Sequence, residues 1–341
     1  MTDEKQNEVS ESKEIPHEIN SISDLSRILQ TLGEPEKGHT RFFRGHADKD
    51  WQMLPSIYRA QHLIENEDKI IKDALTYCPD DFLPSDTLFE KLVKLQHYGY
   101  STRLLDLTAN ALVALYFAAL SYSNKDGELI ILDIPDTEIK YGDSDTVATL
   151  SAISLRSFLF NIYKAIENAD ADRILKEYEY AERMKKEYRH LEFNTIIPFI
   201  RKYKIIEGKK AFLLSFNNNA DIISLLHDIQ TDKPSFRPVI DYKDLQRVLC
   251  VRAKLNNARI SRQQGCFLLF GINDDKLKPA AIPNEWQRLA SNRQKVLVKA
   301  DRKDAIKKEL ESFGISKRTL FPELEAQATE IMNHYKPQKN K

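Results

Sequence analysis

The stretch from residue 109 to residue 121 restricts the fold more than any other part of the sequence. It predicts a helix with apolar side chains over most of its surface: Leu112, Val113, Leu115, Tyr116, Phe117 and Leu120. Such a helix has no polar face for water and must be covered on several sides. The chain therefore needs other elements around it, and 341 residues of which 42% are hydrophobic can supply that core.

Apolar periodicity and stop signals predict the remaining elements. Further helices are expected at 22–32, 87–97, 302–313 and 322–333, and most of 151–232 has helical character. Strands are expected at 40–45, 128–134, 247–253, 263–270 and 295–299, the third and fourth of these paired across a turn at Asn256-Asn257. The pattern predicts an α+β fold with mixed, largely antiparallel sheets that form a cleft and are surrounded by helices.

The composition along the chain predicts one large domain. Residues 1–18 are polar and are expected to form a disordered leader, and residues 336–341 a flexible tail. Residues 19–335 are expected to form the domain, with a helical insert at about 151–232.

Charge and cysteine content exclude several classes of protein. The net charge is zero, so no overall field attracts nucleic acid or an anionic membrane. Three distant cysteines support neither a disulfide framework nor a zinc site, and no metal-binding motif is present, so no metal is expected. The absence of a long apolar run and of a signal peptide predicts a cytoplasmic protein without a membrane partner.

The first motif is Phe42-Phe43-Arg44-Gly45, followed by Trp51 and by a loop that ends at Arg59. An arginine between aromatic residues and a glycine could present its planar fork to a phosphate, and Gly45 would allow a close approach of backbone to a ligand. The other interpretation is that Arg44 pairs with a buried acid such as Asp106 and only stabilises the fold.

The second motif runs from Gln96-His97-Tyr98-Gly99 through Thr102-Arg103 to Asp106 and Thr108. Arg103 beside the start of the apolar helix could form an anion site, and His97 could act as an acid or base near neutral pH. The structural alternatives are that Asp106 or Thr108 caps this helix and that His97 is a hydrogen-bonded structural residue.

The third motif surrounds Gln263-Gln264-Gly265. On a strand, Gln263, Gly265 and Phe267 would share one face and could recognise a flat ligand over exposed backbone. A bulge or bend of the sheet at Gly265 is the alternative.

Together these motifs resemble the FRG domain, a family named for its Phe-x-Arg-Gly motif, over about residues 20–332. Further matching residues are Pro55-Ser56, Leu104-Leu105, Ala114 to Ala118, Arg259-Ile260, Gly314-Ile315 and Leu320-Phe321-Pro322. The predicted insert has no counterpart in this resemblance.

The strand end at Arg44 is also similar to the first motif of arginine-type ADP-ribosyltransferases. That similarity implies that Arg44 holds the pyrophosphate of NAD and that Thr102 braces the ribose pocket. Those enzymes place a glutamate on a late strand, where Gln263-Gln264 stand here. An amide cannot stabilise an oxocarbenium charge as a carboxylate does, so Asp106 is a candidate for the missing acid.

Two functions fit these motifs, and a third fits the basic runs. The cleft could be catalytic, with Arg44, Thr102, Asp106 and Gln263 acting on NAD as substrate, or it could bind a nucleotide or nucleic-acid end without turnover. Basic runs at 183–210 and 293–308 would instead bind nucleic acid in a salt-dependent way, or are solvated helix faces. The expected partners are a nucleotide or NAD-like molecule and a protein or nucleic-acid target.

Overall fold

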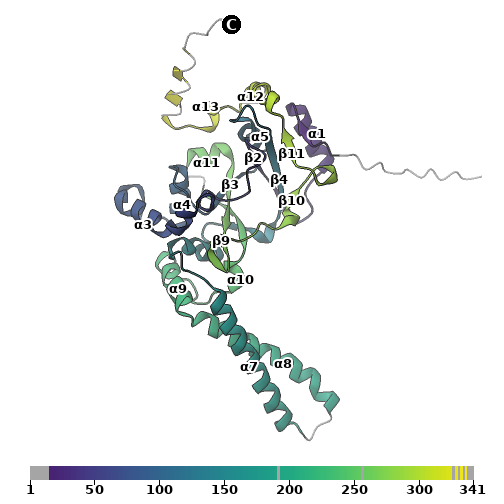
Figure 1. Cartoon of the computed structure of the whole chain (residues 1–341), viewed down its shortest axis with the longest axis vertical. Coiled ribbons are helices and arrows are strands. Elements are labelled where there is room, and N and C mark those ends of the chain that lie inside the picture. Colours follow the sequence, from purple (N-terminus) through teal and green to yellow (C-terminus); the bar gives the residue numbers. More distant parts are fainter. Residues whose placement is uncertain are drawn as a thin grey trace, which may run out of the picture.

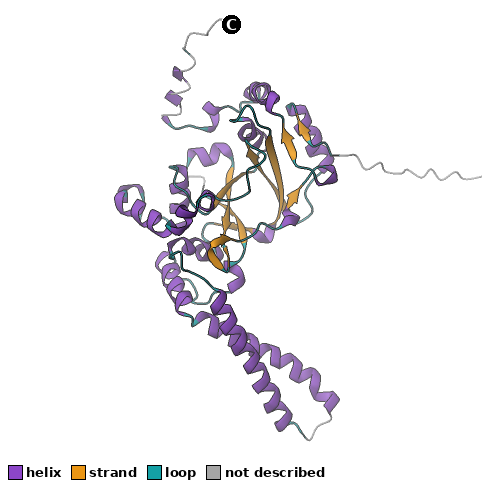
Figure 2. Ribbon diagram, viewed as in Figure 1, coloured by secondary structure: helices purple, strands orange, loops and turns teal. Residues whose placement is uncertain are grey.

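The computed structural model of this chain describes residues 15–189, 193–254, 257–324, 327–328, 331–332 and 335. Strands form its centre, and helices lie around them (Figure 2). In the described part of the chain, the main sheet is open and has nine strands in the order β1-β11-β4-β2-β3-β7-β6-β5, with β10 also paired to β4. β1 pairs with β11 in parallel, as does β5 with β6, and the other registered pairs are antiparallel. The predicted α+β fold with a mixed, largely antiparallel sheet is confirmed.

The strands and helices have the following bounds. The strands are β1 (Glu18–Ile19), β2 (His39–His46), β3 (Leu104–Thr108), β4 (Gly127–Pro135), β5 (Ile139–Tyr141), β6 (Val248–Arg252), β7 (Gly265–Phe270), β8 (Ile272–Asn273), β9 (Asp275–Pro279), β10 (Gln287–Arg288) and β11 (Val296–Val298). The helices are α1 (Ile22–Leu32), α2 (Gln61–Glu65), α3 (Glu67–Tyr77), α4 (Leu88–His97), α5 (Ala111–Ala119), α6 (Asp145–Ala152), α7 (Tyr163–Glu187), α8 (Phe193–Asn217), α9 (Ala220–Asp232), α10 (Tyr242–Leu245), α11 (Ala258–Gln263), α12 (Lys303–Ser312) and α13 (Lys317–Leu320).

The apolar helix α5 is buried, as its sequence requires. Val113, Leu115 and Ala118 are fully covered, and they share one core cluster with Phe43 of β2 and residues of α1, α12 and β11. Two glycines allow this packing. A Cβ on Gly45 would lie 2.0 Å from the carbonyl oxygen of Ala114, and a Cβ on Gly127 would lie 2.5 Å from that of Ala118. The backbone of α5 therefore rests directly on β2 and β4.

The helices α7 and α8 form a long antiparallel hairpin that projects from the body of the molecule (Figure 1). Gly208 of α8 faces the side chain of Glu177 on α7, and Lys204 forms an ion pair with the same carboxylate at 3.7 Å. The predicted helical content of 151–232 is confirmed over the described residues, which also include part of α6 and all of α9. That this segment is an insert into an FRG-type domain stays a prediction.

Several local predictions need correction. Asn110, and neither Asp106 nor Thr108, caps α5, because its side chain accepts from the N–H of Leu112 at 3.0 Å. Arg302 occupies the N-cap position of α12. At the start of α4, Thr87 and Glu90 form a capping box.

The segment before β7 also differs from its prediction. β6 and β7 pair antiparallel as expected, but Gln263 ends the short helix α11 and strand β7 begins only at Gly265. Gln264 links the two with φ of 47°, which turns the chain from helix to strand. Gln263, Gly265 and Phe267 therefore do not share one strand face. Asn256 of the predicted turn lies outside the described residues.

The two ends of the chain are only partly described. Glu18, predicted as the end of the leader, begins strand β1 and pairs with Leu297 of β11. The rest of the predicted leader up to residue 14, parts of the predicted helix at 322–333 and the tail at 336–341 lie outside the described residues. In the part that the structure describes, no helix combines the length and apolar character needed to cross a bilayer.

Candidate functional site

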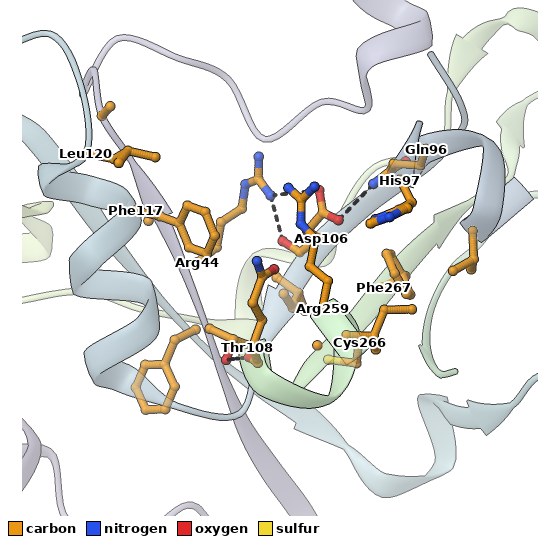
Figure 3. A pocket seen from close by; sticks show the side chains of 18 of the residues that line it. Arg44, Gln96, His97, Asp106, Thr108, Phe117, Leu120, Arg259, Cys266 and Phe267 are labelled. Atoms are coloured by element: carbon orange, nitrogen blue, oxygen red, sulfur yellow. Dashed lines mark hydrogen bonds and ion pairs between the residues drawn. The ribbon is translucent and has the colours of Figure 1, made fainter. Parts of the chain in front are cut away.

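A pocket of about 310 Å³ opens where β2, β3 and β7 meet the ends of α4, α5 and α11 (Figure 3). Its polar lining combines two arginines, one carboxylate and several neutral groups. Its apolar lining is rich in aromatic rings. The lining residues include Phe43, Arg44, Gly45, Trp51, Gln96, His97, Asp106, Phe117, Arg259, Gln263, Cys266 and Phe267.

Arg44 is held on two sides by neighbouring groups. Its Nε donates to Nε2 of His46 at 2.9 Å, and its Nη1 donates to the main-chain carbonyl of Asp106 at 2.6 Å. Burial lowers the pKa of Arg44 to about 10. The negative charge of Asp106 opposes this shift, and the positive charge of Arg59 adds to it. The guanidinium still carries its charge at neutral pH. Among the described residues, no hydrogen bond engages its Nη2, so this donor is available to a ligand.

His46 is neutral because its surroundings oppose protonation. Burial lowers its pKa to about 3, assisted by the positive charges of Arg44, Arg59 and Lys295. Its Nε2 accepts the hydrogen bond from Arg44, so the ring proton is on Nδ1. A neutral acceptor on Nε orients the guanidinium without cancelling its charge.

Asp106 is the only acid among the lining residues. It lies in the middle of β3 between buried leucines, yet its side chain is 65% exposed. Its Oδ1 accepts from Nε2 of Gln96 at 2.9 Å, and its Oδ2 lies 3.9 Å from Nη1 of Arg44. The predicted ion pair of Arg44 with Asp106 is therefore present, but the acid is not buried. The main-chain carbonyl of Asp106 also accepts from Arg44, and its carboxylate lines the pocket.

Aromatic rings form the walls. Trp51 meets His46 edge-on at 5.9 Å between ring centroids and Tyr122 at 5.4 Å, and it remains 38% exposed. Phe117 of α5 contacts the ring of Phe321 at 6.1 Å in the same manner. Planar ligands stack on such surfaces.

Arg259 supplies a second positive charge to the pocket and is not among the predicted site residues. Its guanidinium lies 4.7 Å from the ring centroid of Phe321 and points, in Figure 3, toward Arg44 and Asp106. It is the second residue of α11, a short helix capped by Asn257. The signal in the sequence is Asn257, which can cap a helix that carries Arg259, whereas the predicted turn and strand left no helix here.

His97 also lies in the pocket wall. Its Nε2 is 3.5 Å from Oε1 of Glu323, in the chain that follows α13. Burial lowers the pKa of His97, Arg259 lowers it further, and Glu323 opposes the shift. The ring is therefore neutral near pH 7 and can donate or accept a hydrogen bond.

The structure brings together six of the predicted site residues: Arg44, Gly45, Gln96, His97, Asp106 and Gln263. The other five do not line the pocket. Thr102 is fully buried behind Gln96, Tyr98 is 63% exposed at the end of α4, and Arg59 is exposed on its loop. Gln264 contributes its main-chain carbonyl to Ala109.

The prediction of an anion site at Arg103 is wrong. Arg103 is completely buried and donates from Nε to Glu67 at 2.9 Å and from Nη2 to the same carboxylate at 2.5 Å. Its Nη1 donates to the carbonyl of Phe270, and Lys276 lies 3.1 Å from Glu67 on the other side. Because both oxygens of the Glu67 carboxylate and all three nitrogens of the Arg103 guanidinium are engaged, Arg103 has a structural role.

Two further predictions change with the geometry. The amide of Gln263 donates to the carbonyl of Leu320 at 3.1 Å, so it connects the pocket wall to the C-terminal segment. Gly45 lines the pocket, but the close approach that it allows is that of α5. The contacts of Gln263 and Gly45 are thus with other parts of the fold, namely Leu320 and α5.

No group of three or more His, Cys, Asp or Glu side chains suited to a metal ion occurs within the described ranges. The lining instead offers guanidinium, amide and aromatic groups. Such groups bind an organic anion with a planar ring.

Comparison with known proteins adds one finding. Residues 39–127 match the model of the FRG domain, and this range contains β2, α4, β3 and α5. Neither the curated proteins nor the solved structures gave a significant match. The matched segment supplies part of the pocket lining, including Arg44, Gln96, His97, Asp106 and Phe117.

Proposed function

We propose that the pocket centred on Arg44 binds NAD or a related nucleotide. The observation that carries the proposal is the convergence of Arg44 and Arg259 with Asp106 in one pocket with aromatic walls. With His97 neutral, two positive charges face one negative charge, which favours an anionic ligand. A diphosphate accepts several hydrogen bonds from guanidinium groups and suits this arrangement.

The aromatic walls complement a ring next to that anion. Trp51 and Phe117 line the pocket and could contact nicotinamide or adenine. The volume of about 310 Å³ is at the lower end of the range for ligand sites. We therefore expect the pocket to enclose one nucleoside and the phosphates, with the rest of the dinucleotide outside.

The chemistry that this geometry would support is ADP-ribosyl transfer. The bond between nicotinamide and the ribose C1′ breaks, and nicotinamide leaves as a neutral molecule with the bonding electron pair. The Asp106 carboxylate would stabilise the oxocarbenium ion that forms. Water or an acceptor side chain then adds to C1′ and loses a proton.

Binding without turnover is the second candidate. It is favoured by the neutral amide of Gln263, which donates to the carbonyl of Leu320 and supplies no carboxylate where the resemblance to arginine-type ADP-ribosyltransferases implies a glutamate. The two candidates share the pocket and differ only in whether nicotinamide is released.

Calorimetric titration with NAD and ADP-ribose, together with chromatography of released nicotinamide, tests both candidates. Arg44→Lys keeps the charge but cannot reach both His46 and Asp106, and we expect a loss of affinity of about tenfold or more. Arg237→Ala removes an exposed arginine outside the pocket lining and is the matched control.

The outcomes separate the candidates. Release of nicotinamide that Asp106→Asn abolishes, while binding is retained, supports the enzyme. Saturable binding without release supports the binding module. If neither ligand binds the wild-type protein, the proposal is wrong, and binding that ignores Arg44 and weakens steeply with salt would assign the function to the basic runs.

A further inference from the structure

Thr102 lies behind the pocket wall and is connected to it by hydrogen bonds. Its hydroxyl donates to Oε1 of Gln96 at 2.5 Å, and the Nε2 of Gln96 donates to Oδ1 of Asp106 at 2.9 Å. Thr102 itself is fully buried, whereas the side chain of Asp106 is 65% exposed. A buried hydroxyl is thus linked through one amide to the acid in the pocket.

The direction of these bonds follows from the surroundings of Thr102. The N–H of Leu104 donates to the Thr102 hydroxyl oxygen at 3.2 Å, which leaves the hydroxyl proton for Gln96. The hydroxyl proton therefore requires an oxygen from Gln96, and the amide must turn its NH2 group toward Asp106. A flipped amide would place its oxygen against the carboxylate and lose both bonds.

The backbone fixes Thr102 in turn. Its N–H donates to the hydroxyl of Ser56 at 3.3 Å, and its carbonyl accepts from the N–H of Ile57 at 3.3 Å. Thr102 is therefore held by the loop that follows the first motif and precedes α2. The position of Oδ1 of Asp106 therefore depends, through Gln96 and Thr102, on contacts that lie outside the pocket.

We infer that Thr102 and Gln96 are positioning residues: Thr102 orients the amide of Gln96, and Gln96 occupies Oδ1 of Asp106 and leaves Oδ2 directed at the ligand between Arg44 and Arg259. The role of Asp106 toward the ligand rests on the proposed function, whereas the hydrogen-bonded chain does not. The amide of Gln96 restrains the plane of the carboxylate, because rotation out of this plane would break its hydrogen bond to Nε2.

The chain is tested first without ligand, by NMR of the side-chain amide of Gln96 and the carboxyl carbon of Asp106. Gln96→Leu and Asp106→Asn assign the two signals. Thr102→Val removes the hydroxyl at nearly constant volume, and Thr102→Ser restores it. We expect Thr102→Val to move the Gln96 amide signals toward the position of solvent-exposed glutamines and to shift the Asp106 signal, with both signals recovering in Thr102→Ser.

Thr149→Val is the matched control. Thr149 is also a buried threonine, but its hydroxyl donates to the carbonyl of Asp145 within α6. It should leave both signals in place. Signals that stay unchanged in Thr102→Val, or that move equally in Thr149→Val, would overturn the inference even if the protein binds NAD.

A second readout connects the chain to turnover. If the wild-type protein releases nicotinamide, Thr102→Val should lower kcat about tenfold, the loss expected for a misplaced charged hydrogen-bonding group, and change KM less than twofold. Thr102→Ser should restore kcat. Failure to bind NAD would reject the proposed function and leave the NMR result to decide on the positioning chain.

Discussion

Nη1 of Arg44 donates to the main-chain carbonyl of Asp106 at 2.6 Å, although the registered pairing of β2 with β3 is limited to Phe43 and Thr108. A side chain thus takes the place of a ladder hydrogen bond where two neighbouring strands separate. Residues of both β2 and β3 line the pocket at this point. Arg44, which joins the two strands, also contributes its positive charge to the pocket. Arg44 therefore serves the fold and the site together.

Replacing Arg44 by alanine should consequently lower stability as well as ligand binding. The substitution leaves the buried Nε2 of His46 and the carbonyl of Asp106 without their donor, at a cost of about 1–3 kcal/mol in the free energy of unfolding. Urea denaturation measures this loss. An unchanged midpoint would show that Arg44 contributes nothing to the fold, and binding assays with this variant need the folded fraction as a reference.

Gly45→Ala should destabilise the protein strongly. The new methyl group would lie 2.0 Å from the carbonyl oxygen of Ala114, so α5 must move away from β2. Overpacking against backbone costs about 3 kcal/mol or more. Gly265→Ala is the control on β7, because its methyl group would meet its nearest neighbour at an ordinary 3.5 Å. Equal thermal midpoints for the two variants would contradict this account of α5.

Glu67→Gln should be among the most damaging substitutions of a polar residue. It leaves Arg103 and Lys276 completely buried without an opposing carboxylate, and breaking such a buried pair costs about 3–5 kcal/mol. Glu179→Gln breaks an exposed pair with Lys176 and should change stability by less than about 0.5 kcal/mol. Chemical denaturation of the two variants gives the comparison, and similar losses would speak against a structural role of Arg103.

Acid should weaken the fold through His46 before the carboxylates titrate. Its pKa is about 3 in the folded chain and 6.5 as an ordinary value, so the unfolded state binds more protons between these limits. The free energy of unfolding then falls as the pH decreases from about 6.5, by about 2 kcal/mol at pH 5.

His46→Gln should flatten this pH dependence, since glutamine can accept from Arg44 through its side-chain oxygen and does not titrate. Denaturation curves between pH 7.5 and pH 4.5 measure the slope. His97→Gln is the comparison, because the pKa of His97 is also lowered and contributes to the slope with the same sign. A slope that persists in His46→Gln would assign the acid sensitivity to other groups.

Phe321→Ala should weaken ligand binding while the fold persists. Phe321 lies between Arg259 and Phe117, and loss of its cation–π contact frees the Arg259 guanidinium at a cost of about 0.5–1 kcal/mol, or a two- to fivefold higher Kd. Phe313→Ala, at an exposed phenylalanine after α12, is the control. Titration with ADP-ribose decides, and equal affinities would remove Phe321 from the site.

Much of the secondary structure was predictable because its signals are short-range. The apolar periodicity of α1 and the capping box of α4 depend on neighbours within a few residues. Competing local signals caused the errors. Asn110 lies closer to the first turn of α5 than Asp106 or Thr108, and the cap at Asn257 starts a helix in a segment that was interpreted as a turn.

The site was predictable in part. Arg44, Gln96, His97 and Asp106 carry recognisable motifs and do meet in the pocket. Arg103 carries an equally good motif and does not, because its partner Glu67 lies 36 residues earlier on another element. Which of two arginines is buried in an ion pair and which faces a pocket depends on contacts that local sequence does not contain.

The amino-acid sequence alone thus determined the class of fold, the buried helix α5 and the segment with the FRG pattern, since hydrophobic periodicity and capping act over single elements. The tertiary structure alone decided that Arg259 lines the same pocket as Arg44, that the hydroxyl of Thr102 donates to Gln96 and that the backbone of α5 packs directly on Gly45. These relationships join residues of different elements, and their energies arise only when packing brings the elements within contact distance.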